Sequence, residues 1–339
     1  MSDITTLHGR PIHDGQGGNQ PTPITPLRDL PCSFLIGAAY RADDATSSDP
    51  DYDPPFRREF NSMTPENKFK QVNLNTSDGV WGWTAADLLV TLSETNAQAF
   101  NAHALVYQAA LPTWIIEGGF SAEQLSARME DHVRAVVGRY TGRIATVEVV
   151  NEVWDVNGDF RTGVLYDTIG EDYAKGAFAW AAAEDPNAVL MWNGNEFTQP
   201  GAGLENAITK IGGYLDEGIP IHAVGIQLHL KLDVVEALGL KTVMGQLNST
   251  FKRFAALGLD IHITECDIAI DDPSSAAKRY RQAQWYAAII HQCKRQPAIK
   301  VFTMWGFTAK YSWITRSSRL TVWCMKRFQQ NRKCLFKSS

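Results

Sequence analysis

Two glutamates stand at the ends of apolar segments, where a carboxylate has no packing role. The segment 147–152, "VEVVNE", is a run of valines that ends on Asn151 and Glu152, and the segment 259–267 carries Glu265 near its end. Runs of this kind are typical of interior strands in a parallel sheet. In an α/β barrel the carboxyl ends of the strands converge on one face. Two carboxylates across one cleft, one protonated and one ionised, are the groups that glycoside hydrolysis uses.

Other expected strands also end on polar or aromatic side chains. Each of these residues alone is more often structural: a single histidine is usually a satisfied core residue, and a single tryptophan usually packs in the core. Such residues at the ends of six of eight strands are harder to explain by packing, so we interpret them as one site. They are Glu66, Asn67 and Lys70 after the second strand, His103 on the third, Gln227 and His229 on the sixth, Asp267 after Glu265 on the seventh, and Trp305 on the eighth.

The elements that would position these side chains alternate along the chain. Short apolar segments that read as strands are separated by longer amphipathic segments that read as helices. Eight strands alternating with helices over roughly 270 residues predict a single (β/α)8 TIM barrel of class α/β. A doubly wound open sheet is the alternative, but the first strand is not followed by a Gly-rich phosphate loop. The expected strands are 33–39, 58–62, 97–106, 146–152, 188–193, 223–229, 259–267 and 299–307, and the clearest helices are 85–96, 121–142 and 172–185.

No linker divides the chain into two folding units. We expect a catalytic barrel over residues 31–314, after a loosely ordered leader over 1–30 that is rich in Gly, Pro, Asn and Thr. Residues 315–339 form an atypical basic tail, with seven Lys or Arg and no Asp or Glu. One reading of this tail is simple divergence, and the other is a frameshift near residue 315. Resequencing the gene separates the two, because an uninterrupted reading frame excludes the frameshift.

The bulk composition excludes several classes of function. The 339 residues are 44% hydrophobic with a net charge of −5, which argues against nucleic acid and anionic membrane surfaces as partners. No apolar run approaches the roughly 20 residues that span a bilayer. The five cysteines are scattered without zinc-type spacing, so we expect no metal site. The first residues contain no apolar core of a signal peptide, which leaves a cytoplasmic location open.

Taken in order, the motifs of the chain resemble those of glycoside hydrolase family 10, the endo-β-1,4-xylanases. The resemblance runs from about residue 34 to 314 and implies a (β/α)8 barrel and a retaining mechanism without a cofactor. It also implies xylan or xylooligosaccharide as substrate, a monomer and an extracellular location. The motifs are "EFNSMTPEN" (59–67), "HALV" (103–106), "LPTW" (111–114), "VVNE" (149–152), "GIQLH" (225–229), "ITECDI" (263–268) and "MWGFTAKYSWI" (304–314).

The same resemblance implies a role for each candidate site residue. Glu152 matches the acid/base and Glu265 the nucleophile, and Asn151 would bind the 2-hydroxyl of the sugar. The expected supporting residues are His229 and Gln227 beside Glu265, with Asp267 behind the histidine. The expected substrate-binding residues are Glu66, Asn67 and Lys70 on the non-reducing side, His103, Tyr107 and Trp305 around the sugar at the cleavage point, and Trp313 over the cleft.

One motif departs from the family pattern. After "HxLV" the family continues Trp-His-x-Gln, whereas this chain has Tyr107, Gln108, Ala109 and Ala110. The family glutamine helps to crowd out a hydroxymethyl group, which an alanine cannot do. We therefore keep two alternatives to a xylanase: a related retaining β-1,4-glucanase or xylooligosaccharide hydrolase, and a catalytically weakened relative that binds xylan.

Overall fold

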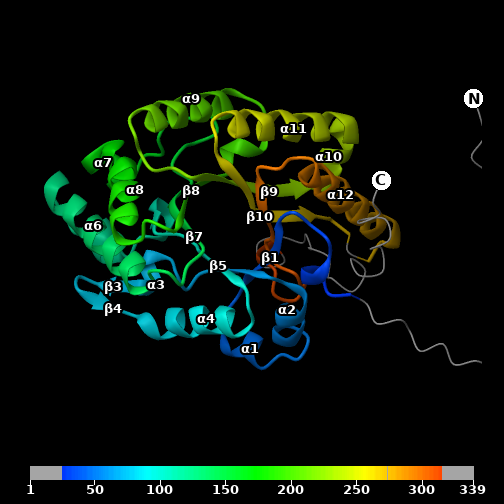
Figure 1. The fold of residues 1–339 in the computed structure, drawn as a ribbon, viewed down its shortest axis with the longest axis horizontal. Coiled ribbons are helices and arrows are strands. Elements are labelled where there is room, and N and C mark those ends of the chain that lie inside the picture. Colours follow the sequence, from blue (N-terminus) through cyan, green and yellow to red (C-terminus); the bar gives the residue numbers. More distant parts are fainter. Residues whose placement is uncertain (1–24, 273, 315–339) are drawn as a thin grey trace, which may run out of the picture.

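The structure is a computed structural model that describes residues 25–272 and 274–314. The first 24 residues of the predicted leader and the whole predicted tail lie outside the described residues. Eight parallel strands close into a barrel, because β1 pairs with β11 and β5 pairs with both β2 and β7 (Figure 1). The barrel strands in chain order are β1 Leu35–Tyr40, β2 Ser62–Pro65, β5 Ala99–Ala102, β7 Thr146–Asn151, β8 Val189–Gly194, β9 Ala223–Lys231, β10 Asp260–Ala269 and β11 Ile299–Met304. The predicted (β/α)8 barrel is confirmed.

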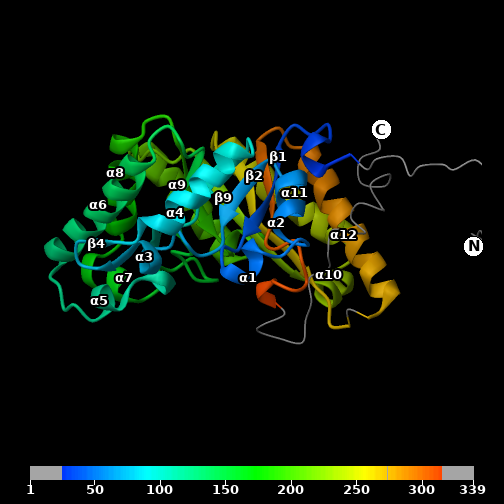
Figure 2. The same ribbon diagram turned by 90° about the horizontal axis from the view of Figure 1, so that it is seen from below.

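Helices lie outside the strands and cover the barrel. The longest of them, α4, α6, α8, α9, α11 and α12, surround the sheet in Figure 1. Figure 2 shows that the short helices α1, α5 and α10 lie along one rim of the molecule. The helices are α1 Asp44–Ser47, α2 Asp53–Glu59, α3 Gln71–Leu74, α4 Trp83–Thr95, α5 Thr113–Ile116, α6 Ala122–Arg139, α7 Val164–Ile169, α8 Asp172–Glu184, α9 Ala202–Asp216, α10 Leu232–Leu238, α11 Leu240–Ala256 and α12 Ala276–Lys294.

Shorter elements complete the connections. Strand β6 extends the barrel by pairing with the end of β7, while β3 and β4 form a separate two-stranded sheet. These elements are β3 Asn75–Ser77, β4 Val80–Trp81, β6 Val106–Tyr107 and the 3-10 helices η1 Leu27–Asp29, η2 Gln108–Ala110 and η3 Glu196–Thr198. Within the described residues, no helix is both long and apolar enough to cross a membrane.

The predicted second strand, 58–62, is misplaced. Residues Asp53–Glu59 form helix α2, and β2 begins only at Ser62. Pro54 and Pro55 explain the error, because proline at the first positions of a helix presets the helical φ and has no N–H to leave unpaired. The predicted strand 97–106 is also not continuous: it divides into β5 and β6 around the turn that carries His103.

The folded part of the chain begins before residue 31, where the expected leader was to end. Leu27 in η1 is completely buried, and its N–H donates to Glu59 Oε2 at 2.9 Å. Arg28 donates to the backbone carbonyls of Arg57, Asn96 and Ala97. These contacts fasten η1 to α2 and to the end of α4, so residues 27–29 belong to the barrel domain.

Candidate active site

The polar side chains predicted from the strand ends meet at the carboxyl face of the barrel. Asn151 ends β7, Gln227 and His229 lie on β9, and Glu265 and Asp267 lie on β10. All but His229 are buried, and the His229 side chain is about one quarter exposed. The barrel topology brings these residues together although up to 116 positions separate them in the chain, from Asn151 to Asp267.

Two irregularities in strand register aim more side chains into the centre than a regular strand could. The β7–β8 pairing shifts between Glu148 and Val150, and the β9–β10 pairing shifts between Ile263 and Glu265. In a regular strand, adjacent residues point to opposite faces, but a bulge places extra side chains on one face. This is why the adjacent residues Thr264 and Glu265 both bond to the side chain of Asn193, at 2.7 and 3.4 Å.

A hydrogen-bond path joins the two candidate carboxylates. Gln227 Nε2 donates to Glu152 Oε1 at 3.3 Å and to Asn151 Oδ1 at 3.1 Å. Asn193 Nδ2 also donates to Asn151 Oδ1, at 2.9 Å, and lies 3.4 Å from Glu265 Oε1. Two amide side chains and Asn151 therefore fix Glu152 and Glu265 relative to one another.

Glu265 belongs to a buried charge network. His229 Nε2 bonds to Glu265 Oε2 at 3.1 Å, and His229 Nδ1 bonds to Asp267 Oδ2 at 3.0 Å. Burial alone would lower the pKa of His229, but its bonds to the two carboxylates raise that pKa to about 10. Burial alone would raise the pKa of Glu265, but the hydrogen bond from His229 and the charges of His103, His229 and Lys70 hold it below its ordinary value. At neutral pH the His229 imidazolium therefore lies between the ionised Glu265 and Asp267. Burial raises the pKa of Asp267.

Glu152 adopts an unusual backbone conformation directly after β7. Its φ is +51°, in the left-handed region that residues other than glycine rarely occupy. Its N–H donates to the carbonyl of Asn193 at 3.0 Å, which holds the turn against the end of β8. Conformations of this kind cost about 1–3 kcal/mol and are found where the surrounding structure imposes them, often at functional sites. The Glu152 side chain is half-buried.

The loop after β2 and strand β6 form one wall of the site. Lys70 Nζ donates to Asn67 Oδ1 at 3.0 Å and lies 5.9 Å from the centre of the Tyr107 ring. Tyr107 is paired with Asn151 in the β6–β7 ladder. Burial and the neighbouring Glu152 carboxylate raise the pKa of the Tyr107 hydroxyl above its ordinary value. Burial likewise raises the pKa of Glu66.

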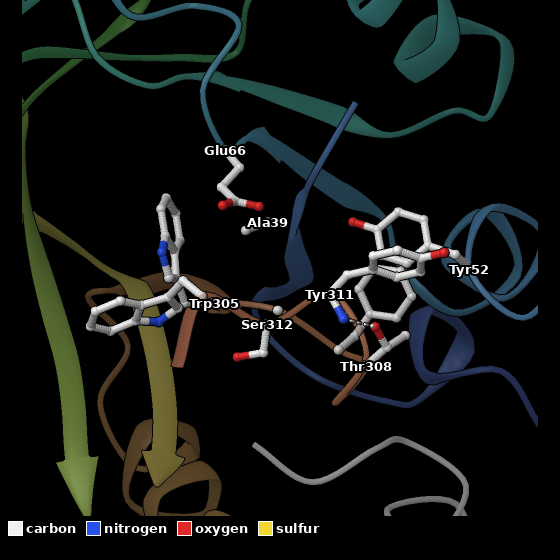
Figure 3. Close-up of a pocket in the computed structure, with 10 residues that line it drawn as sticks. Ala39, Tyr52, Glu66, Trp305, Thr308, Tyr311 and Ser312 are labelled. Atoms are coloured by element: carbon white, nitrogen blue, oxygen red, sulfur yellow. Dashed lines mark hydrogen bonds between the residues drawn. The ribbon is translucent and has the colours of Figure 1, made fainter. Parts of the chain in front are cut away.

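Aromatic side chains contact both histidines of the site. Trp305 lies edge-on to His103, with ring centres 5.0 Å apart, and Trp313 lies in the same way against His229. Trp305, Trp313 and Glu66 line a common pocket. Figure 3 shows the Glu66 carboxylate and Trp305 facing this pocket, with the rings of Tyr52 and Tyr311 packed together at its other side. The contacts described above connect all thirteen predicted site residues, and three of them, Glu66, Trp305 and Trp313, line this pocket.

The sequence interpretation assigned no role to three buried residues that support this site. Glu148 accepts hydrogen bonds from Asn101 at 2.6 Å and Asn193 at 2.9 Å, and it bonds to His103 Nδ1 at 2.7 Å. The signal for Glu148 was present, because it is a charged residue inside a run of valines. Asn101 and Asn193 gave no comparable signal, because a single Asn in a strand can face either side.

Among the described residues, one group of side chains has the composition of a metal site. Ligand atoms of His103, Glu148 and Glu265 all lie within 4.8 Å of one another. Both oxygens of Glu148 accept hydrogen bonds from amide N–H groups, and His103 bonds to one of them. We interpret this group as a hydrogen-bonded support for the site.

Glu196 is a further buried acid that the sequence did not point to. It lies in η3 after β8, is 6% exposed, and its carboxylate oxygens have no hydrogen-bond partner within residues 25–272 and 274–314. Burial raises the pKa of Glu196 to about 8. A buried carboxyl without donors is more stable when it is neutral.

A closed (β/α)8 barrel, with two glutamates joined by amide side chains at the carboxyl face, is typical of the glycoside hydrolases. The comparison with protein families agrees: the model of glycosyl hydrolase family 10 matches residues 30–338. This chain therefore belongs to glycosyl hydrolase family 10, and the predicted resemblance is confirmed. The matched range includes nearly all of the atypical tail.

Individual relatives give the same result. The chain is 32% identical over 295 residues to endo-1,4-beta-xylanase B of Thermotoga neapolitana, covering 85% of this chain and 83% of the relative. It is similar in structure to xylanase 10B from Thermotoga petrophila RKU-1 in complex with xylobiose, with a TM-score of 0.82, 32% identity, and coverage of 88% and 91%. Native xylanase 10B from Thermotoga maritima has a TM-score of 0.83 at 31% identity, with coverage of 91% and 98%.

Proposed function

We propose that this chain is a retaining endo-β-1,4-xylanase in which Glu265 is the nucleophile and Glu152 the acid/base. One observation carries the proposal: Glu265 is 5% exposed, yet His229 holds its pKa below the ordinary value. A nucleophilic carboxylate must be ionised at the pH of the reaction and must have little water around it. Glu152, at the end of the amide path from Glu265, is placed to exchange protons on the other side of the scissile bond.

The reaction follows in two displacements. Glu265 attacks the anomeric carbon while Glu152 donates its proton to the glycosidic oxygen, so the bond from the anomeric carbon to the leaving sugar breaks. Glu152, now ionised, takes a proton from water, and the resulting hydroxide equivalent attacks the anomeric carbon. The ester bond to Glu265 breaks, and the sugar leaves with its original anomeric configuration. We expect the carboxylates to lie about 5–5.5 Å apart, as retaining glycosidases require.

The remaining predicted residues bind and orient the substrate in this proposal. Asn151 accepts hydrogen bonds from Gln227 and Asn193, so its amide N–H group is left to meet the sugar 2-hydroxyl. Glu66, Asn67 and Lys70 bind the sugars on the non-reducing side. His103, Tyr107 and Trp305 surround the ring at the cleavage point, and Trp313 covers it. Tryptophan faces suit this task, because they offer a large apolar surface and one polar N–H.

The substrate class comes from the relatives. Several relatives at 31–32% identity are named endo-1,4-beta-xylanases, and one similar structure contains xylobiose. We therefore propose xylan or xylooligosaccharides as substrates of a monomeric enzyme that uses no cofactor. Family resemblance favours an extracellular location, with a cytoplasmic enzyme acting on imported oligosaccharides as the alternative.

The test compares reducing-sugar release from xylan and from a soluble β-glucan by the wild type, by Glu265→Ala, and by Glu117→Ala as a control. Glu117 is exposed and lies outside the site. We expect the Glu265 variant to lose at least about 10³-fold in rate and the control to keep wild-type activity. NMR of the first product should give the β-anomer. An α-anomer as first product would contradict the retaining mechanism, and a folded wild type without activity would favour the xylan-binding relative.

A related β-1,4-glucanase activity is the second candidate. Gln108 does not point into the site, because its Oε1 accepts the N–H of Leu165 at 3.1 Å. Ala110 has no side chain that could exclude a hydroxymethyl group. Both features favour tolerance of glucose-based chains. If kcat/KM for aryl cellobioside relative to aryl xylobioside is no higher than in relatives that keep the family glutamine, this candidate fails.

A further inference from the structure

A chain of hydrogen bonds connects the surface of the cleft to Glu265. Trp313 Nε1 donates to Asp267 Oδ2 at 2.7 Å. The same oxygen lies 3.0 Å from His229 Nδ1, and His229 Nε2 lies 3.1 Å from Glu265 Oε2. Trp313 lies in the segment after β11, whereas the other residues come from β9 and β10. A segment that contacts the cleft thus reaches the buried carboxylate in three bonds.

Burial changes sharply along this chain of residues. The Trp313 side chain is 39% exposed, whereas Asp267 and Glu265 are 1% and 5% exposed. Trp313 also lines the pocket that Glu66 and Trp305 share. Trp313 is therefore partly exposed beside the pocket, while its N–H is directed at the buried carboxylate of Asp267.

Trp313 constrains His229 in two independent ways. Its ring lies edge-on to the imidazole, with centres 5.0 Å apart and planes at 65°. Its N–H also holds Asp267 Oδ2, which bonds to His229 on the opposite nitrogen from Glu265. Among the described residues, Asp267 Oδ1 has no partner, so the donors to this buried carboxylate converge on Oδ2. Removing the indole N–H would leave Asp267 with fewer donors and His229 with a less fixed acceptor.

We propose that Trp313 is a positioning residue for Glu265: packing of a sugar against its indole and alignment of the carboxylate are coupled through Asp267 and His229. This inference rests on the proposed role of Glu265 as the nucleophile. The coupling acts on the attack step, because displacing a reacting group by about 1 Å can cost roughly 100-fold in rate. The coupling predicts that loss of Trp313 lowers kcat by more than the loss of stacking against the sugar alone would.

The experiment measures trapping of Glu265 by a dinitrophenyl 2-deoxy-2-fluoro-β-xylobioside. Its leaving group needs no protonation, so the rate constant of inactivation reports the nucleophile without Glu152. Trp313→Phe keeps an aromatic face but deletes the N–H. Trp305→Phe is the matched control, because it also removes an indole, but one that contacts His103 and not His229. We expect the first variant to lower the inactivation rate constant about 10-fold with little change in the inhibitor's binding constant, and the second mainly to weaken binding.

A second measurement uses the wild type and does not depend on how a variant folds. The indole N–H resonances of 15N-labelled protein are recorded before and after trapping, with Trp313 assigned from the variant spectrum or by selective labelling. A shift of the Trp313 resonance when Glu265 is esterified supports the coupling. An unshifted resonance, together with wild-type trapping of the phenylalanine variant, overturns it. Absence of trapping in the wild type would instead reject the retaining mechanism itself.

Discussion

At the scale of single residues, the buried carboxyl groups differ in pKa because their surroundings differ. Glu265 is buried but has an imidazolium donor, so its pKa is lowered. Glu196 is also buried, and among the described residues no side chain donates to it, so burial raises its pKa to about 8. The chemistry available to each acid is therefore decided by its partners and not by burial alone.

The first prediction concerns His229. Replacing it by Asn removes the positive charge that keeps Glu265 ionised, so burial should then raise the pKa of Glu265. The acid limb of the kcat/KM profile, which reports groups of the free enzyme, should move to higher pH by about one unit or more. The exposed His291→Asn serves as a control and should leave the profile unchanged. An unmoved acid limb in the His229 variant would show that this histidine does not control Glu265.

The second prediction concerns the pH dependence of stability at Glu196. Its pKa is about 8 in the folded protein and near the ordinary 4.5 when the chain unfolds, so the folded state binds the extra proton between these values. The contribution of Glu196 to the free energy of unfolding is thus fully present below about pH 4.5. As the pH rises from there to about 8, the free energy of unfolding should fall by up to about 4 kcal/mol. Glu196→Gln should remove this loss, whereas the exposed Glu117→Gln should not.

Urea unfolding at pH 5 and pH 9 measures this effect. The drop in free energy of unfolding between the two pH values should be smaller in Glu196→Gln than in the wild type and in the control. Equal drops in all three proteins would mean that Glu196 is hydrated or paired in solution.

At the scale of elements, the centre depends on the close approach of β7, β8, β9 and β10. Asn193 on β8 bonds to side chains of β7 and β10, and β9 must leave room for it. A Cβ on Gly225 would lie 2.3 Å from Asn193 Oδ1 and 2.8 Å from Thr264 Cγ2. Glycine at position 225 therefore leaves room for the Asn193 side chain of β8 to bond to both β7 and β10.

The third prediction tests that close approach. Gly225→Ala should displace Asn193, lower kcat on xylan by about 10-fold or more, and destabilise the fold by about 1–3 kcal/mol through overpacking. Gly245→Ala is the matched control: Gly245 lies inside α11, and an added Cβ there meets nothing within 4 Å. The control should be about 0.5–1 kcal/mol more stable than the wild type and equally active. Full activity of the Gly225 variant would show that the Asn193 network tolerates displacement.

At the scale of the whole molecule, the barrel is closed by β1 and β11 and fastened by the segment that precedes β1. Leu27 is completely buried, and the N–H of its backbone bonds to Glu59, which is itself 1% exposed. The segment 27–29 thus ties β1 to α2 before the sheet begins.

The fourth prediction follows from this fastening. Leu27→Ala should lower the free energy of unfolding by about 2–5 kcal/mol, because it removes a fully buried side chain and leaves a cavity. Leu88→Ala provides the control, since Leu88 is 66% exposed on α4 and should change stability by less than about 0.5 kcal/mol. Equal urea midpoints for the two variants would mean that η1 does not contribute to the stability of the barrel.

The architecture and the residue types of the site could largely be predicted from the order of residues along the chain. Seven of the eight barrel strands lie where apolar runs predicted them, because strands buried on both faces must be apolar along most of their length. The misplaced strand, 58–62, follows Pro54 and Pro55, which favour the first turn of a helix and begin α2. Glu152, Glu265 and their neighbours were predicted because polar residues at the ends of apolar strands have no packing role.

The interactions between these residues, in contrast, depend on the folded chain. The register shifts in β7 and β10 bring Glu148, Thr264 and Glu265 to the same face, and strict alternation along the sequence gives no sign of them. Trp313 and Asp267 are 46 residues apart, and their hydrogen bond exists only because the segment after β11 lies against β10. The pKa of each buried acid depends on donors from other strands. Such contacts depend on distances across the closed barrel, which no local pattern of residues encodes.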